Sequence, residues 1–187
     1  MPAPIRTERL HLLPFAPGDA GLLVDLDADP EVVKYVHLGP FTPPPADRYE
    51  AEVLPKFLPH PADGPALGCR RVHPDAAGEP GPFAGWAMLR PVGRAGWFAA
   101  APDLNLDPAT PELGYRLARR FWGNGYATEA SRAVLAGLPA GASAVAIRQA
   151  DNAGSGRVME KCGFRLARTF QLPGVPRPTA LHVRDPA

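Results

Sequence analysis

The stretch ELGYRLARRFWGNGYATEASRAVL, residues 112–135, joins a strand pattern, a glycine-containing loop and a helix pattern. Strand-like alternation ends at Ala118, and small or apolar residues recur on one helical face from Asn124 onward. The first N–H groups of a helix have no acceptor within it and lie at the positive end of its dipole. Glycine leaves such a backbone accessible, so the loop is suited to a phosphate or pyrophosphate. The structural alternative is a tight turn in which Gly123 and Gly125 only permit unusual dihedral angles.

Two common nucleotide-binding motifs do not fit this loop. A P-loop requires a lysine followed by serine or threonine after its second glycine, and no such pair follows here. A dinucleotide fingerprint requires a third glycine, and Thr128 occupies that position. The loop therefore belongs to neither class.

The rest of the chain alternates between strand and helix patterns, with proline-rich loops between them. Strands are expected at residues 5–15, 66–73, 83–91, 112–118, 142–150, 164–172 and 179–185. Helices are expected at residues 18–29, 30–36 and 124–138, in a short segment capped by Thr42, and at 151–163 with Asp151 as the cap. The order predicts a mixed α/β (α+β) fold with late strand–helix crossovers and a closing antiparallel hairpin.

Four segments, in order, resemble the GNAT acetyltransferase superfamily, and in particular its Rim-type ribosomal-protein N-acetyltransferase branch. They are TERLHLLP at 7–14, DPEVVKYV at 29–36, the quoted stretch, and DNAGSGRVMEKCGF at 151–164. The superfamily pattern Gln/Arg-x-x-Gly-x-Gly/Ala falls on residues 122–127, with Trp122 in place of Gln/Arg. The resemblance implies one acetyltransferase domain over 1–187, a mostly antiparallel central sheet splayed in the middle and flanked by helices, and acetyl-CoA as cosubstrate without a metal.

The resemblance also implies where the cofactor binds. Amides of the loop and of the helix start would hold the pyrophosphate, and the pantetheine would pair with strand backbone near Leu117. The asparagine and serine that match Asn152 and Ser155 contact CoA or its thioester in the family, although Asp151 and Asn152 could instead be helix caps alone. The cofactor-binding candidates are Leu117, Trp122, Gly123, Asn124, Gly125, Tyr126, Ala127, Thr128, Asn152 and Ser155.

Acetyl transfer to an amine requires a base for the amine and a donor for the thiolate. Glu112 is the candidate base because it begins the strand that enters the cleft, and the alternative is a strand-end charge paired with an arginine. Many superfamily members carry a tyrosine where this chain has Met159, which cannot donate a proton. Ser155 is the candidate acid, and solvent is the alternative. Glu129, on the helix, is expected to make a salt bridge or a packing contact.

Several other residues are expected to be structural. Trp86 and Trp97 are interpreted as core residues, and Cys162 as a buried thiol. Tyr115 and Arg116 should face opposite sides of the sheet, with one of them on the acceptor side. The five histidines have no metal-ligand spacing and are interpreted as surface or isolated structural residues.

The charge and composition of the whole chain limit the classes of partner and the cellular location that we expect. Its 187 residues carry a formal net charge of +1 with scattered Lys and Arg, which argues against a nucleic-acid partner or a membrane surface. The beginning of the sequence does not resemble a signal peptide, and two distant cysteines indicate reduced thiols in the cytoplasm. The resemblance implies an amine acceptor, either a protein N-terminus or a small molecule such as an amino acid or an aminoglycoside, expected beside residues 39–65. A homodimer and a non-catalytic acyl-CoA-binding module remain open.

Overall fold

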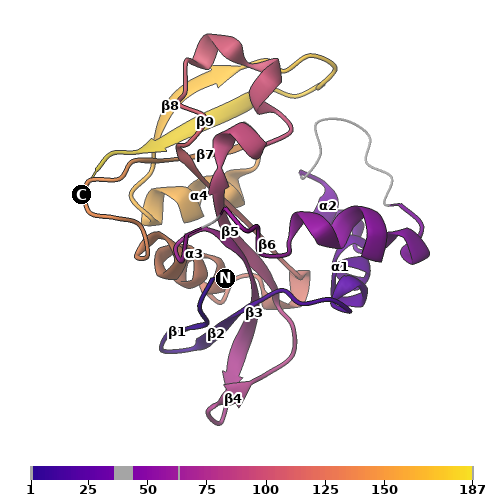
Figure 1. Ribbon diagram of the computed structural model, residues 1–187. Helices are drawn as coiled ribbons and strands as arrows, with labels where there is room; N and C mark the ends of the chain where they lie inside the picture. Colours follow the sequence, from indigo (N-terminus) through magenta and orange to yellow (C-terminus); the bar gives the residue numbers. More distant parts are fainter. Residues whose placement is uncertain (1, 36–43, 63, 187) are drawn as a thin grey trace.

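The structure is a computed structural model that describes residues 2–35, 44–62 and 64–186. Its centre is a sheet in the order β1-β2-β3-β5-β6-β7-β9-β8, with β4 paired to β3 (Figure 1). All neighbouring strands in that order are antiparallel except β6 and β7, which are parallel. The strands are β1 Ile5–Arg6, β2 Leu10–Pro14, β3 Gly68–Ala76, β4 Glu79–Pro80, β5 Gly85–Pro91, β6 Pro111–Leu117, β7 Ala144–Gln149, β8 Arg165–Phe170 and β9 Thr179–Arg184.

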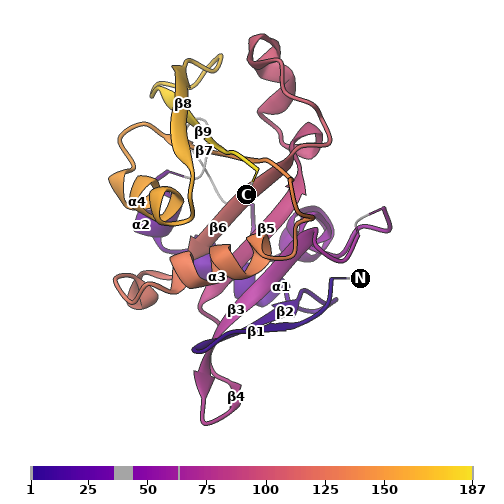
Figure 2. The same cartoon turned by 90° about the vertical axis from the view of Figure 1, so that its left-hand side faces the viewer.

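Helices cover both faces of this sheet, α1 and α2 on one face and α3 and α4 on the other (Figures 1 and 2). The α-helices are α1 Ala20–Asp27, α2 Pro30–Val33, α3 Tyr126–Leu135 and α4 Ala153–Lys161. Short helical turns follow one another at Ala46–Arg48, Tyr49–Val53 and Leu54–Lys56 on the α1 side, and others lie at Val92–Arg94, Phe98–Ala100, Pro102–Leu104 and Arg119–Phe121. The structure thus confirms the mixed α/β fold.

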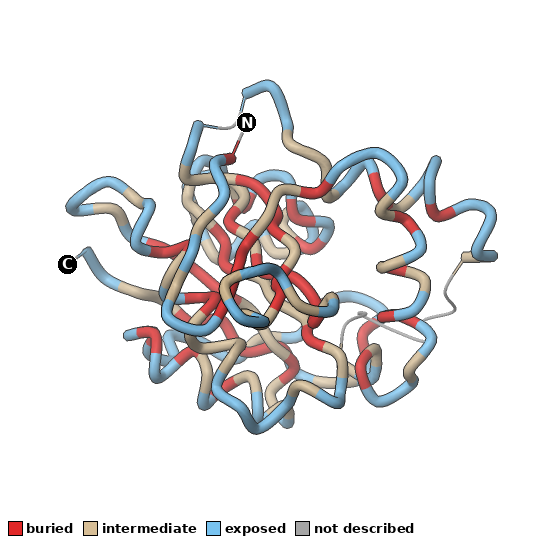
Figure 3. The backbone as a smooth tube through the Cα atoms, turned by 90° about the horizontal axis from the view of Figure 1, so that it is seen from below, coloured by how far each residue is buried: buried red, intermediate tan, exposed pale blue. Residues whose placement is uncertain are grey.

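Strand alternation divides the core between the two faces, and the buried residues gather at the centre of the molecule (Figure 3). One cluster lies under α3 and α4 and includes Leu10, Leu12, Leu113, Leu117, Val134 and Met159. A second lies under α1 and includes Leu23, Leu26, Tyr49, Leu54 and Trp86. A third includes Val92, Trp97, Val145, Leu172 and Leu181. Helices on the two faces therefore meet different side chains of the same strands, which explains why Tyr115 and Arg116 point to opposite sides.

The sheet splays between β6 and β7, as the resemblance implied. β6 pairs with β5 along its whole length, from Pro111 with Pro91 to Leu117 with Gly85. Among the described residues, β6 pairs with β7 at one position, Glu112 with Val145. The backbone of β6 beyond Glu112 is therefore left without a strand partner on its β7 side.

Some sequence predictions need correction. Residues 5–15, predicted as one strand, form β1 and β2 around a turn in which Thr7 N donates to Leu10 O at 2.9 Å and Thr7 Oγ1 accepts from Leu10 N at 3.0 Å. The cap of α4 is Asn152, whose Oδ1 accepts from Ser155 N at 3.1 Å, whereas Asp151 makes an ion pair with Arg177. Thr42, the predicted cap of the short helix, lies outside the described residues. No helix within the described ranges is long and apolar enough to span a membrane.

Candidate functional site

The glycine loop runs directly from the end of β6 to the start of α3. Gly123 and Gly125 have φ angles of 78° and 80°, and Gly125 is the N-cap residue of α3. Both angles lie in the left-handed region that favours glycine, so the glycines are required by the turn itself. An ideal Cβ at Gly123 would meet nothing within 4 Å, whereas one at Gly125 would lie 3.4 Å from Arg9 Nη2.

Six successive amides of this loop are unpaired. Within the described part of the chain, no hydrogen bond has the N–H of residues 123–128 as its donor, and the first amide to bond is Glu129 N, to Gly125 O at 3.1 Å. These N–H groups stand at the N-terminus of a ten-residue helix. Unpaired amides at the positive end of a helix dipole form a binding surface for an anion.

The carbonyl groups of the same loop are held by donors. Asn124 Nδ2 donates to Phe121 O at 3.2 Å and to Trp122 O at 3.1 Å. Arg9 Nη1 donates to Asn124 O at 3.0 Å. In a trans peptide the C=O and the following N–H point in opposite directions, so these bonds also fix the N–H groups of Gly123 and Gly125.

Leu117 and Trp122 lie at the edge of the splay. Ala118 N bonds to Ala84 O at 2.9 Å, so Leu117, one residue earlier, directs its own N–H and C=O away from β5. Trp122 Nε1 donates to that Leu117 carbonyl at 2.7 Å, while 48% of the Trp122 surface stays exposed. The tryptophan that departs from the family pattern thus closes the turn between strand and loop.

Asn152 and Ser155 lie at the start of α4, and Ser155 is hydrogen-bonded to β6 across the splay. Tyr115, from β6, donates its hydroxyl to Ser155 O at 3.0 Å and lies 2.9 Å from Ser155 Oγ. Burial raises the pKa of the Tyr115 phenol, so it stays neutral at ordinary pH. The sequence left open which of Tyr115 and Arg116 lies on the acceptor side, and the bond to Ser155 was not foreseen because only the fold brings β6 and α4 together. Met159, on the same helix, is buried in the core.

Glu112 lies at the point where the splay begins and is 3% exposed. Its Oε2 accepts from Arg90 Nε at 2.7 Å and its Oε1 from Trp97 Nε1 at 2.8 Å. Arg90 stands directly opposite Glu112 on β5, which explains the pairing. The arginine pair is the alternative that the sequence left open, and the indole bond was not foreseen. Trp86 and Trp97 are both buried, as expected.

A second set of polar groups lies on the α1 face of the sheet, around Arg116 of β6, two residues after Gly114. Arg116 Nη1 forms an ion pair with Asp27 Oδ1, and Tyr49 donates to Asp27 Oδ2 at 3.0 Å. Burial, reinforced by the charge of Asp27, raises the pKa of Tyr49 to about 12. Arg119 Nε also pairs with Asp29 Oδ2 at 3.1 Å. These contacts join the end of β6 to the first helices, and sequence spacing alone could not reveal them.

The remaining polar candidates have structural environments. Cys69 and Cys162 are free and buried, and burial raises the pKa of both thiols. His11, His73 and His182 are buried and hydrogen-bonded, whereas His60 is exposed and His37 lies outside the described residues. No cluster of three potential metal ligands occurs among the residues that the structure describes.

Comparison with known proteins identifies the family. A family profile described as "Acetyltransferase (GNAT) domain" matches residues 9–165. The chain is 30% identical over 173 residues to FsC-acetyl coenzyme A-N(2)-transacetylase of Aspergillus fumigatus, covering 89% of this chain and 66% of that protein. It therefore spans slightly less than two thirds of the length of that curated relative.

Two solved structures share the fold. A GNAT-family acetyltransferase from Bacillus anthracis superimposes with a TM-score of 0.67 at 22% identity, covering 98% of each chain. RimL, a ribosomal-protein alpha-N-acetyltransferase solved with coenzyme A, gives a TM-score of 0.65 at 16% identity and also covers 98% of each chain. The profile match over residues 9–165, together with the splayed sheet and the loop of free amides, leads to one conclusion: the chain belongs to the GNAT acetyltransferase family.

Proposed function

We propose that the protein is a single-domain N-acetyltransferase that transfers the acetyl group of acetyl-CoA to a primary amine by direct attack in a ternary complex. The observation that carries the proposal is the run of free amides at residues 123–128, at the end of the strand where the sheet splays. A thioester cosubstrate with a pyrophosphate requires an anion site beside a cleft between strands, and both features meet here. A Rim-type assignment within the family is part of the same proposal.

In this proposal the loop amides bind the pyrophosphate, and the pantetheine runs along the free edge of β6. The N–H of Leu117 and the backbone of Tyr115 would pair with it, because both residues direct their polar groups away from β5. The Leu117 carbonyl keeps a second lone pair beside its bond from Trp122. The thioester would then approach the first turn of α4, where Asn152 and Ser155 lie.

Glu112 is the proposed base, since it faces the α1 side of the sheet at the narrow end of the splay. The same face carries Gly114 and Arg116, which contact side chains of the α1-side core. Each oxygen of a carboxylate has two lone-pair sites, so the bonds from Arg90 and Trp97 leave acceptor capacity for an amine proton. The amine attacks the thioester carbonyl after losing that proton, and the thioester C–S bond breaks as the amide C–N bond forms.

Ser155 is the proposed donor to the departing thiolate. A hydroxyl near the sulfur can give its proton as the C–S bond breaks, and Tyr115 holds that hydroxyl in place. The phenol itself stays neutral because burial raises its pKa, so Tyr115 acts as an orienting partner. This arrangement replaces the tyrosine that many relatives carry at the position of Met159.

The acceptor is proposed to be a primary amine that enters from the α1 side. The name of the Aspergillus relative specifies transfer from acetyl-CoA to a nitrogen, N(2), which supports a nitrogen acceptor. A protein N-terminus, an amino acid and an aminoglycoside all present such a group. We propose a cytoplasmic location, where the two free buried thiols would stay reduced. The proposed reaction needs residues of one chain only and is compatible with a homodimer.

The test has two stages, cofactor binding and amine-dependent turnover, and a positive result is expected in each. In a thermal-shift assay acetyl-CoA and CoA should raise the melting temperature, because each binds only the folded protein. Thiol release from acetyl-CoA should then exceed hydrolysis for at least one amine in a panel of an N-terminal peptide, free amino acids and an aminoglycoside. Cofactor binding without turnover for any amine would instead support the acyl-CoA-binding module.

A further inference from the structure

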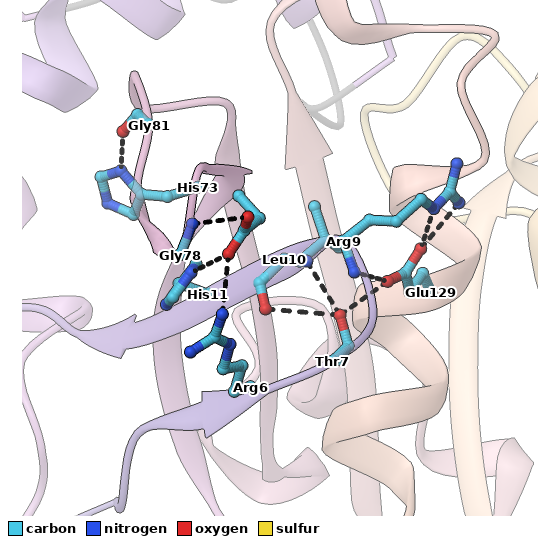
Figure 4. Close-up of polar contacts among 10 residues, drawn as sticks. Arg6, Thr7, Arg9, Leu10, His11, His73, Gly78, Gly81 and Glu129 are labelled. Atoms are coloured by element: carbon cyan, nitrogen blue, oxygen red, sulfur yellow. Dashed lines mark hydrogen bonds and ion pairs between the residues drawn. The ribbon is translucent and has the colours of Figure 1, made fainter.

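The turn between β1 and β2 lies beside the start of α3, where Thr7 and Arg9 bind the carboxylate of Glu129 (Figure 4). Thr7 Oγ1 donates to Glu129 Oε1 at 2.6 Å, and the backbone N–H of Arg9 donates to the same oxygen at 3.0 Å. Arg9 Nε and Nη2 lie 2.8 and 2.7 Å from Glu129 Oε2. This confirms the salt bridge expected for Glu129 and identifies Arg9, 120 residues earlier in the sequence, as its partner.

Glu129 is held as an acceptor for these donors. Burial alone would raise the pKa of its carboxyl, but the hydrogen bonds from Thr7 and Arg9 and the charge of Arg9 outweigh burial and lower it. Its side chain is 18% exposed, whereas that of Arg9 is 48% exposed. The carboxylate therefore fixes one side of the guanidinium and leaves the other side directed at the loop.

The guanidinium also contacts the glycine loop at two points and lies close to the backbone of Gly125. Arg9 Nη1 donates to Asn124 O at 3.0 Å. The guanidinium carbon lies 5.2 Å from the centroid of the Tyr126 ring. Arg9 Nη2 lies 3.4 Å from where a Cβ of Gly125 would stand. Arg9 thus lies against three successive residues of the predicted pyrophosphate site.

The bond to Asn124 O determines the direction of one amide. The carbonyl of Asn124 and the N–H of Gly125 belong to the same planar peptide and point in opposite directions. Glycine at 125 gives this peptide more rotational freedom than another residue would, and the bond from Arg9 restrains it. Holding the Asn124 carbonyl toward Arg9 therefore turns the Gly125 N–H to the opposite side.

We propose that Arg9 is a positioning residue for cofactor binding: through Asn124 O it presets the Gly125 amide, while Glu129 and Thr7 keep the guanidinium in place. This rests on the proposed function, because it assigns the preset amides to the pyrophosphate of CoA. A preset amide binds the anion without the entropic cost of ordering the loop, so Arg9 contributes to affinity and not to the chemical step.

The test compares Arg9→Met with Arg6→Met, a matched control from the same hairpin. Arg6 is 62% exposed and pairs with Asp75 at 3.2 Å, away from the loop (Figure 4). Arg9→Met should weaken CoA and inorganic pyrophosphate binding about 10-fold, the size expected for a hydrogen bond from a charged group. The kcat at saturating acetyl-CoA should stay within about 2-fold of wild type. Arg6→Met should match wild type in both measurements.

A truncated donor separates positioning from general loss of structure. S-acetylpantetheine lacks the pyrophosphate, so its kcat/KM should be the same for wild type and Arg9→Met, whereas a damaged fold would lower it for both donors. If Arg9→Met does not fold, Glu129→Gln takes its place with the same pair of donors, because it releases the guanidinium from its anchor. Unchanged CoA affinity in a folded Arg9→Met protein overturns the inference and leaves the proposed function standing. A wild-type protein that neither binds CoA nor transfers acetyl overturns both.

Discussion

The hydroxyl of Tyr115 on β6 lies 2.9 Å from Oγ of Ser155 on α4, across the splay between β6 and β7. A phenol has one proton to donate, and Tyr115 Oη lies 3.0 Å from Ser155 O as well. When Tyr115 donates to that carbonyl, the Ser155 hydroxyl donates to Tyr115. The two hydroxyls can exchange these roles by rotation, so Ser155 can turn its proton toward a ligand in the splay without leaving Tyr115 unpaired.

Ser155→Ala should lower kcat about 100-fold or more, the range found when a single proton or hydrogen-bond donor to the reacting group is removed. Tyr115→Phe should lower kcat less, about 10-fold, because it removes the partner and leaves the donor. Steady-state kinetics at saturating acetyl-CoA measures both variants. A Ser155→Ala enzyme with wild-type kcat would mean that solvent protonates the thiolate.

Gly125→Val should abolish most cofactor binding in a protein that still folds. The substitution adds a β-branched side chain at a φ of 80°, beside Arg9 and on the anion-binding loop. The matched control is Gly141→Val, because Gly141 has a φ of 78° and nothing within 4 Å of its ideal Cβ. Calorimetric titration with CoA should show a loss of at least 10-fold in affinity for the loop variant, since the branched side chain strains the loop at a positive φ and crowds Arg9, which holds the Gly125 amide in place. Equal affinity in the two variants would reject the loop as the pyrophosphate site.

Glu112→Gln should lower kcat about 100- to 10,000-fold if Glu112 is the base, and should change CoA affinity little. Since the amide also disturbs the bonds to Arg90 and Trp97, Trp97→Phe serves as the control: it removes the indole donor and leaves the carboxylate. A rate profile against pH measures the effect, and its low-pH limb should flatten in Glu112→Gln. Near wild-type kcat across the profile would leave Glu112 as a structural ion pair with Arg90.

The ion pair of Glu129 predicts a pH-dependent contribution to stability. The folded-state pKa of this carboxyl lies below its ordinary value of 4.5, so its stabilisation is complete above pH 4.5 and disappears as the pH falls through the lowered value. The difference in unfolding free energy between wild type and Glu129→Gln should therefore be constant near neutral pH and shrink in acid. The exposed Glu79 offers Glu79→Gln as a control with no such trend. A difference that persists unchanged in acid would show that the ionised carboxylate is not what stabilises the fold.

The sequence predicted the elements of the fold and the residues of the loop, because both depend on local patterns. Leu10 and Leu12 alternate with polar neighbours and are fully buried, and Gly123 and Gly125 stand at the start of a helix as their spacing indicated. The turn at residues 7–9 was missed because the polar run Thr-Glu-Arg was taken as part of one strand, whereas Thr7 turns the chain by its bonds to Leu10.

Long-range partners could not be predicted from spacing. Arg90 opposes Glu112 only in the register that pairs β5 with β6, and Arg9 meets Glu129 only because α3 packs beside β2. The Tyr115–Ser155 contact requires a strand and a helix on either side of the splay. These contacts determine the electrostatics of the candidate site. The location of the candidate site could therefore be predicted from the sequence, whereas the partners of its ionisable groups could be identified only in the structure.

The most direct test of the central claim is the response of the backbone amides to CoA in a ¹H–¹⁵N NMR titration of the 187-residue chain. The claim is that the free N–H groups of residues 123–128 bind the pyrophosphate. Their resonances should move downfield with CoA and with inorganic pyrophosphate, as amides do when they donate to an anion, and should stay in place with pantetheine, which lacks the phosphates. Shifts of equal size for CoA and pantetheine, or saturation by CoA with these amides unmoved, would contradict it.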